Sequence, residues 1–392
     1  MIKILNKIFN KNKYKAIDKE IIRKYNDSRD DEQNKIIKTV KKNKMLLCYA
    51  PFNNIFFNSQ GQITACCRSS YIFDQYPQKK LKDIWFGSEF NKLRDPIKNR
   101  SLSVACQTCQ YPMEKGDFDN VMAKIFDRNY LNKNKYPTVL EFELINTCNL
   151  ECIMCLGTLS SSIRKNKDKL PPLPMLYDQN FIEQLKDFIP HIHEAKFYGG
   201  EPFLINIYFD ILDAIISINP NVRITITTNG TVLNNRIKDL LGKLKFNINV
   251  SVDSVHKENF ESIRKNAEYD VVMQNLLYFQ EHCKRNNSIF CICVSPMRQN
   301  WHELPDIIQY FNNIDALVSF NTVYDPPDCA LWNLNDTEIQ AIYDKLSIYD
   351  FPENSFVQKH NKNKYNAFLN QLIAWRNESY EKKRDNFKAC IV

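Results

Sequence analysis

The stretch Val139-Leu-Glu-Phe-Glu-Leu-Ile-Asn-Thr-Cys148-Asn-Leu-Glu-Cys152-Ile-Met-Cys155 carries most of the information about this chain. Its first half predicts a β-strand over 139–145, and its second half places three cysteines at the spacing C-x3-C-x2-C. From this stretch onward, β-forming runs alternate with helical patterns. The candidate strands cover 139–145, 195–198, 223–227, 247–252, 289–294 and 317–323. The helical patterns between them cover 181–189, 207–218, 237–244, 271–283 and 304–311.

Six β–α units in succession predict a parallel sheet with crossover helices. About 185 residues are too few for an eight-unit barrel, which takes about 250. A partial barrel and an open doubly wound sheet both fit this pattern. Before these units we expect a hairpin over 55–57 and 63–66 and a helix over 82–98 that Pro96 interrupts. After them, residues 336–385 predict terminal helices.

Composition and charge exclude several classes of protein. The chain has 392 residues, of which 44% are hydrophobic, and this is enough for a core. No run approaches the roughly 18 apolar residues of a membrane span, and the N-terminus lacks the apolar segment of a secretory signal. We therefore expect a cytoplasmic protein whose 13 cysteines are reduced. The net charge of +8 resides in residues 1–47, and the neutral body weighs against a nucleic-acid partner.

The three-cysteine loop points to an iron–sulfur centre. Cys148, Cys152 and Cys155 can hold three irons of a 4Fe–4S cluster, and the absence of a fourth cysteine in this loop leaves one iron open for another ligand. Zinc is the alternative, but a structural zinc site takes four ligands that commonly come as two pairs. The odd triple fits the cluster better.

Polar motifs follow the next three strands in turn. They are Gly199-Gly-Glu-Pro202, Thr227-Thr-Asn-Gly230 and Ser251-Val-Asp-Ser254. Each motif alone is also typical of an ordinary turn. Ligand sites of parallel α/β folds form at the carboxyl ends of the strands. We therefore expect these motifs and the cysteine loop to meet at one end of the sheet.

With these motifs, residues 138–323 resemble the radical S-adenosylmethionine (SAM) enzymes, whose core is a partial (β/α)6 barrel. The resemblance implies a 4Fe–4S cluster on Cys148, Cys152 and Cys155, with SAM chelating the open iron. Met154 departs from the family, which usually has an aromatic residue there. The positions at which the resemblance places contacts to SAM are Gly199, Gly200, Glu201, Pro202, Thr228, Asn229, Ser251, Asp253, Arg264 and the backbone of Val294.

A second set of cysteines precedes this segment. Cys48 and Cys66 form the pattern C-x12-G-x4-C, and the pair Cys106 and Cys109 follows. Four cysteines could hold zinc or a fully ligated cluster, and the spacing leaves both open. The pattern resembles the first half of the SPASM auxiliary domain in its shorter Twitch form, which implies an auxiliary 4Fe–4S cluster on these four residues. The domain normally follows the barrel in that family, and Cys67 could replace Cys66.

We therefore expect four segments. They are a basic helical arm over 1–44, a small α+β auxiliary-cluster domain over 45–130, a partial barrel over 131–330 and a C-terminal helical segment over 331–392. The resemblance also implies an external one-electron donor of the flavodoxin or ferredoxin type. With that electron, SAM is cleaved to a 5′-deoxyadenosyl radical that abstracts hydrogen from a substrate.

The expected substrate is a peptide or protein side chain, and oxidation, cross-linking and epimerisation all stay open. A small sugar or alcohol, or an RNA, is the alternative substrate. Epimerisation needs a hydrogen donor, for which Cys291, Cys293 and Cys329 are candidates. Strand alternation puts Cys291 and Cys293 on one face. Further residues that could line the site are Glu141, Glu143, Tyr324, Asp325, Asp328 and Trp332.

Overall fold

A computed structural model of the chain describes residues 19–28, 45–102, 106–116, 118, 121–129 and 135–378. These residues form two compact units. Unit 1 contains the described residues up to 144 together with 175–195, and unit 2 contains 145–174 and 196–378. The predicted arm over 1–44 lies outside the described residues except for helix α2 (Lys19–Ser28). The four predicted segment boundaries stay predictions.

Unit 1 contains the predicted hairpin. Strand β1 (Asn54–Asn58) pairs antiparallel with β2 (Gln62–Thr64), which pairs with the short β3 (Asp74–Gln75). Gly61 closes the turn with φ +76°, a conformation that glycine adopts most easily. The sequence did not reveal that β1 also pairs in parallel with β4 (Val139–Glu143). The cysteine-rich segment therefore shares a sheet with the first strand of the β–α series.

The helices of unit 1 differ from the prediction in one place. Instead of a single helix interrupted at Pro96, the chain forms α5 (Leu81–Trp85) and α6 (Ser88–Lys98), and α6 includes Pro96. The break falls at Gly87, whose extended backbone (ψ 169°) cannot continue the first helix. In the described part of unit 1, the other helices besides α2 are α4 (Ala50–Asn53), α7 (Gln107–Lys115), η4 (Met122–Asn129), α9 (Gln179–Leu185) and η5 (Ile189–His191).

Aromatic side chains form the core of unit 1. The Phe57 ring of β1 stacks on Phe142 of β4 with 5.5 Å between centroids. Phe181 of α9 packs edge-on against Phe57 at 5.2 Å, and the stacked pair Tyr76 and Tyr177 completes the cluster. All five side chains are buried. This core explains why the hairpin and β4 belong to one compact unit.

The predicted series of six β–α units is confirmed. After β4 come β5 (Glu194–Phe197), within which the two units divide, and β6 (Arg223–Thr228). In unit 2, β6 pairs in parallel with β7 (Lys245–Ser251), which pairs with β8 (Phe290–Val294), and that strand pairs with β9 (Leu317–Phe320). The helices of unit 2 are α8 (Ser161–Asn166), η6 (Pro202–Leu204), α10 (Asn206–Ile218), α11 (Asn235–Lys243), α12 (Lys257–Ile263), α13 (Tyr269–Arg285), η7 (Trp301–Glu303), α14 (Leu304–Asn313), α15 (Asp336–Leu346) and α16 (Phe356–Arg376).

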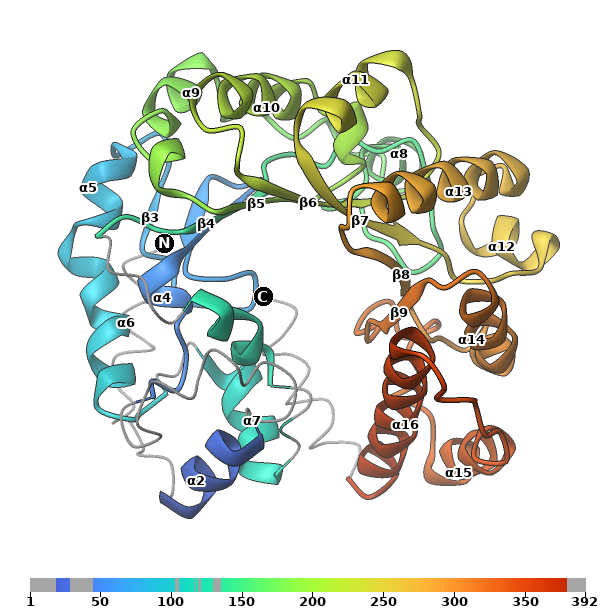
Figure 1. Cartoon of the computed structure of the whole chain (residues 1–392). Helices are drawn as coiled ribbons and strands as arrows, with labels where there is room; N and C mark the ends of the chain where they lie inside the picture. Colours follow the sequence, from blue (N-terminus) through green and yellow to red (C-terminus); the bar gives the residue numbers. More distant parts are fainter. Residues whose placement is uncertain are drawn as a thin grey trace. The chain divides into compact units, whose positions relative to one another are not determined.

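The sheet of unit 2 has one apolar face and one polar face. Helices α10, α11 and α13 cover one side of β6, β7 and β8 (Figure 1). In β7 the side chains of Phe246, Ile248 and Val250 are fully buried, whereas the alternating Asn249 and Ser251 are only half-buried. Strands of parallel sheets are normally apolar on both faces. We call the following half-buried residues the polar face: Thr225, Thr227, Asn249, Ser251, Cys291, Cys293 and Ser319.

The C-terminal helix α16 closes the edge of this sheet. The carboxamide oxygen of the fully buried Asn361 accepts the N–H of Val318 at 2.8 Å, and its nitrogen donates to the carbonyl of Ala316 at 3.0 Å. These bonds occupy groups that an edge strand would otherwise leave open. In the part of the chain that the structure describes, no helix combines the length and apolar character needed to cross a membrane.

Candidate active site

The cysteine loop follows β4 and is held by three serines at the start of α8. Ser160 caps this helix by accepting the N–H of Ile163, and its hydroxyl donates to the carbonyl of Leu150 at 2.7 Å. The hydroxyls of Ser161 and Ser162 both donate to the carbonyl of Cys148, at 3.1 and 2.8 Å. The loop is therefore fixed before any ligand binds.

Two further contacts join the loop to the end of α12. The N–H of Ile153 donates to the carbonyl of Ile263 at 2.9 Å, and the N–H of Glu151 donates to that of Lys265 at 3.0 Å. Cys329, a candidate hydrogen donor from the sequence, is buried and donates its thiol to the carbonyl of Ile153 at 3.6 Å. Cys329 thus contacts the loop between its second and third cysteines.

The three thiols of the loop lie close enough to influence one another. Burial raises the pKa of Cys152 to about 11 and that of Cys155 to about 12, and Cys148 adds to both effects. None of the three forms a disulfide. Cys148 accepts hydrogen bonds at sulfur from the N–H of Leu150 at 3.5 Å and from the side-chain nitrogen of Asn229 at 3.9 Å. Unoxidised thiols with N–H donors nearby fit the sulfur ligands of an iron–sulfur cluster.

The Gly-Gly-Glu-Pro turn lies against the cysteine loop. The N–H of Glu201 donates to the carbonyl of Thr147 at 2.7 Å. Gly200 has φ +51°, and a side chain there would overlap the same carbonyl. Only glycine allows this close approach. Gly199 has φ +76°, and Pro202 begins η6.

The carboxylate of Glu201 connects this turn to the end of β6. It is fully buried and accepts the hydroxyl of Thr228 at 2.8 Å and the N–H groups of Asn229 and Phe203 at 2.7 and 3.1 Å. Burial raises its pKa to about 7 in spite of these donors. The sequence resemblance places Glu201 among the contacts to SAM. The structure shows that it also holds two of the other predicted residues in position.

A buried ion pair brings Asp253 and Arg264 together. The guanidinium Nη2 of Arg264 lies 2.6 Å from Oδ2 of Asp253, and 7% and 0% of the two side chains are exposed. Asp253 follows β7, and its Oδ1 accepts the N–H of Ser295 after β8 at 2.7 Å. Burial raises the pKa of Asp253, and the Arg264 cation opposes this effect. The Arg264 cation also opposes the rise in the pKa of Cys152 and Cys155 that burial causes. Its charge therefore reaches the cysteine loop.

This ion pair has unused hydrogen-bonding capacity. Among the described residues, the buried Nε of Arg264 has no acceptor, and Oδ2 of Asp253 has the ionic contact but no well-directed donor. A buried polar atom without a partner costs about 1–3 kcal/mol. A ligand that carries a carboxylate for Arg264 and hydroxyls for Asp253 would satisfy both atoms. The residues present therefore fit the SAM molecule that the sequence resemblance implies.

Two more candidate residues lie at the ends of their strands. Ser251 ends β7 on the polar face, opposite Cys293 in the register of β7 and β8. Val294 ends β8, is fully buried and already accepts the N–H of Asn321 at its carbonyl. Beyond β9, the carbonyl of Tyr324 accepts the indole N–H of Trp332 at 3.1 Å.

Cys291 and Cys293 form a thiol pair on the polar face. The Ser319 hydroxyl lies 3.6 Å from the sulfur of Cys291 and 3.5 Å from that of Cys293. The neighbouring Cys291 thiol lowers the pKa of Cys293, and burial opposes this effect. Arg264 also lowers it, which places the pair within the field of the buried ion pair. The structure thus brings together two of the three candidate hydrogen donors.

The remaining cysteine and glutamate candidates lie in unit 1. Burial raises the pKa of Cys48, Cys66 and Cys109. Neighbouring thiols, including that of Cys106, raise the pKa of Cys48 and Cys66 further. Cys67 also acts on Cys66 but is exposed. In β4, Glu141 is buried and Glu143 is half-buried. Among the described residues no three Cys, His, Asp or Glu side chains are as close as one metal ion requires.

Sequence reasoning missed the polar residues that position the site. Asn300 is fully buried, and its side-chain nitrogen donates to the carbonyls of Asp253 and Ser295 at 2.8 and 3.1 Å. Asn146 likewise donates to the carbonyl of Gly157 across the cysteine loop at 2.8 Å. The run of three serines after the cysteines was a readable helix-capping signal. The two asparagines carried no such signal.

Comparison with known families matches both cysteine-rich segments. Residues 142–311 match the model described as the radical SAM superfamily, and residues 48–110 match the SPASM model, described as an iron–sulfur cluster-binding domain. The second match favours iron–sulfur over the zinc alternative in unit 1. Both matches agree with the resemblances drawn from the sequence.

Curated relatives cover only part of the chain. The GTP 3′,8-cyclase of Limosilactobacillus fermentum is 26% identical over 51% of this chain and 57% of its own length. The molybdenum cofactor biosynthesis protein 1 of Dictyostelium discoideum is 26% identical over 55% of this chain and 32% of its own length. The chain thus spans little more than half of the first relative.

Two of the solved structures that are similar to this chain are native anSMEcpe with bound AdoMet and Streptococcus suis SuiB bound to precursor peptide SuiA. The first is 16% identical, covers 60% of this chain and 62% of its own, and has a TM-score of 0.43. The second is 15% identical, covers 61% and 51%, and has a TM-score of 0.40.

Proposed function

Because the chain is a radical SAM enzyme with a SPASM-type auxiliary domain, we propose that it modifies a peptide or protein side chain. The two domains imply a 4Fe–4S cluster that works with SAM and an auxiliary iron–sulfur cluster. When bound, the first cluster and SAM supply the one-electron cleavage of SAM and the removal of a hydrogen atom from a substrate C–H bond. The protein supplies binding, orientation and the electrostatic environment.

We assign the cluster to Cys148, Cys152 and Cys155, whose loop is held by α8 and by the end of α12. Arg264 would bind the carboxylate of SAM through its free Nε, and Asp253 would accept from the ribose hydroxyls. Glu201 keeps the Gly-Gly turn and the end of β6 in place through its three hydrogen bonds. These roles follow from the contacts of the protein itself.

The polar face carries the argument for a peptide. Its side chains are neutral and able to form hydrogen bonds, and they are only half-buried although the sheet is parallel. A peptide presents a repeating series of neutral N–H and C=O groups, which such a surface can satisfy. The match of residues 48–110 to the SPASM model also supports a peptide, because many radical SAM enzymes with such domains modify peptides.

A small-molecule substrate is the second candidate. The names of the curated relatives favour it, since the first of them is a GTP 3′,8-cyclase. A nucleoside triphosphate needs several cations around its phosphates. The polar face contains none, and this is why we place the peptide first.

The decisive experiment measures 5′-deoxyadenosine formed by the anaerobically reconstituted enzyme with SAM and dithionite. We expect a peptide fraction of a cell extract to stimulate its formation, and protease treatment of that fraction to abolish the stimulation. The variant with Cys148, Cys152 and Cys155 changed to alanine should be inactive. Cys283→Ala, at a buried thiol on the apolar side of the sheet, is the control and should stay active. Stimulation by GTP or by a protease-resistant fraction instead would establish the second candidate.

The fate of the substrate radical separates oxidation from hydrogen return. If an auxiliary cluster held by unit 1 accepted the electron of the substrate radical, and a proton were lost, the net reaction would be an oxidation or a cross-link. Return of a hydrogen atom from the Cys293 thiol would lead to epimerisation and leave a thiyl radical, which one electron from the external donor and a proton would convert back to the thiol. The Ser319 hydroxyl lies 3.5 Å from this sulfur. A reaction in deuterium oxide distinguishes the two, because only hydrogen return from an exchangeable thiol places deuterium on carbon.

A further inference from the structure

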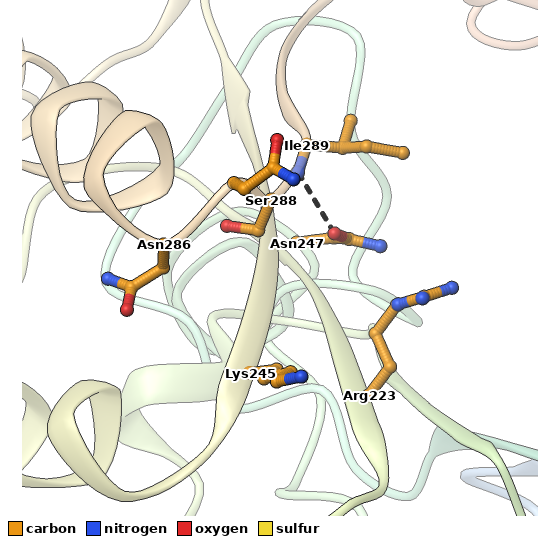
Figure 2. A pocket seen from close by; sticks show the side chains of 7 residues that line it. Arg223, Lys245, Asn247, Asn286, Ser288 and Ile289 are labelled. Atoms are coloured by element: carbon orange, nitrogen blue, oxygen red, sulfur yellow. Dashed lines mark hydrogen bonds between the residues drawn. The ribbon is translucent and has the colours of Figure 1, made fainter.

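A pocket lies at the amino ends of β6 and β7 in unit 2. It has a volume of about 410 Å³, which is within the usual range for ligand pockets. Arg223 starts β6 and Lys245 starts β7, and the loop before β8 forms the other side (Figure 2). The residues that line it are Arg223, Lys245, Asn247, Asn286, Asn287, Ser288 and Ile289.

The two cations of the pocket lie side by side without a counter-ion. Arg223 and Lys245 are direct partners in the parallel register of β6 and β7. Paired strands lie about 4.8 Å apart, and like charges in directly opposite positions destabilise a sheet. Among the described residues, neither side chain has an ion pair or a hydrogen bond, and no carboxylate lines the pocket. This arrangement is unfavourable unless an anion joins the two cations.

Asn247 adds a buried donor to the two cations. The residue is only 7% exposed, and its side-chain oxygen accepts the N–H of Ile289 at 3.0 Å. This bond fixes the orientation of the carboxamide, so the amide nitrogen is available to the pocket. Figure 2 shows this nitrogen turned to the side on which the guanidinium of Arg223 lies. Two cations and an oriented N–H donor form a suitable set for an oxyanion.

The pocket is separate from the candidate active site. Lys245 and Ser251 are the first and last residues of β7, six positions apart. At about 3.3 Å per residue, the two ends are about 20 Å apart. The period of two nevertheless places Arg223, Lys245 and Asn247 on the same side of the sheet as the polar face. A long ligand that lies on the polar face could therefore reach the pocket with one end.

We propose that Arg223, Lys245 and Asn247 form an oxyanion site that binds a carboxylate or phosphate group. This site goes beyond the proposed reaction, since none of its residues belongs to the cofactor machinery. The carboxylate of an acidic peptide and the phosphate of a small molecule share this chemistry. Which of the two it binds also bears on the class of substrate.

The test is calorimetric titration of the reconstituted full chain, with sodium pyrophosphate in one arm and an acetylated tetraglutamate amide in the other. We expect at least one probe to bind with a Kd below about 1 mM. The double variant Arg223→Gln/Lys245→Gln should weaken that binding at least tenfold. Both residues are exposed, so the variant should fold, which circular dichroism checks. Lys243→Gln is the matched control, because Lys243 is nearby and already paired with Asp239 at 2.7 Å.

Each outcome is informative. Loss of pyrophosphate binding in the double variant supports a phosphate ligand, and loss of peptide binding supports a carboxylate ligand. Asn247→Ala should weaken the same probe by a smaller factor. Equal binding of a probe by wild type and double variant overturns the proposal. The basic residues before position 48 would then account for the measured binding. Failure of both probes to bind below about 10 mM overturns it as well.

Discussion

Substitution of Arg264 by methionine should loosen the cysteine loop even without a cofactor. Methionine keeps much of the side-chain volume but leaves the fully buried carboxylate of Asp253 without its cation. Removal of one partner from a buried ion pair costs about 3–5 kcal/mol, since the other charge stays buried and uncompensated. The effect should reach the cysteine loop through the two residues on either side of Arg264. The backbone carbonyls of Ile263 and Lys265 accept the N–H groups of Ile153 and Glu151 in that loop.

A double-mutant cycle gives the magnitude. Asp253→Asn keeps an oxygen for the N–H of Ser295 but removes the charge, so Asp253→Asn/Arg264→Met buries no lone charge. We expect the double variant to be at least about 2 kcal/mol more stable than Arg264→Met alone. Lys243→Met is the control, because its ion pair with Asp239 is exposed and contributes about 0.5 kcal/mol or less.

Hydrogen exchange with mass spectrometry is the assay. A loss of about 3 kcal/mol corresponds to roughly 100-fold faster exchange of the Glu151 and Ile153 amides, provided that local opening controls exchange. Urea unfolding of the metal-free chain measures the same loss globally. The reasoning is refuted if Arg264→Met speeds exchange in this loop by less than about fivefold, or if the double variant exchanges faster than the single one.

Three shorter predictions follow from the site and its strands. Burial raises the pKa of Glu143 from 4.5 to about 7. The stability that this group contributes, about 3 kcal/mol, is therefore complete below pH 4.5 and is lost as the pH rises through 7. Urea unfolding of Glu143→Gln at a series of pH values should lack this dependence. Iodoacetamide at pH 7 should alkylate Cys293 several-fold more slowly in Cys291→Ala, because loss of the neighbouring thiol raises the pKa of Cys293; an unchanged rate by mass spectrometry contradicts this influence of Cys291. Gly200→Ala should lower iron content after reconstitution, since its side chain overlaps the cysteine loop, whereas Gly242→Ala, with open space around it, should retain wild-type iron.

Much of the fold was readable from local patterns. The six strands of the β–α series lie within a few residues of their predicted positions, because strand and helix periodicities are properties of short segments. The hairpin around Gly61 was readable for the same reason. The helix break at Gly87 was not readable, because the sequence pattern put the interruption at Pro96, which α6 contains. The pairing of β1 with β4 was also missed, since these strands are about 80 residues apart.

The sequence by itself determined the chemistry of the site. Cysteine spacing and the order of the polar turns after the strands indicated a radical SAM enzyme with an auxiliary iron–sulfur domain, and the family matches confirm this. Such information is local, because a loop of eight residues already contains all three thiolates of the cluster site.

Only the tertiary structure decided which polar atoms are paired and which are free. It joined Arg264 to Asp253, assigned Glu201 to three internal donors, and placed the thiols of Cys291 and Cys293 around one hydroxyl. It also set Arg223 beside Lys245, which is 22 positions further along the chain. Burial, charge pairing and pKa depend on distances between segments remote in sequence. Those distances are set by how the strands pair and how the helices pack on them.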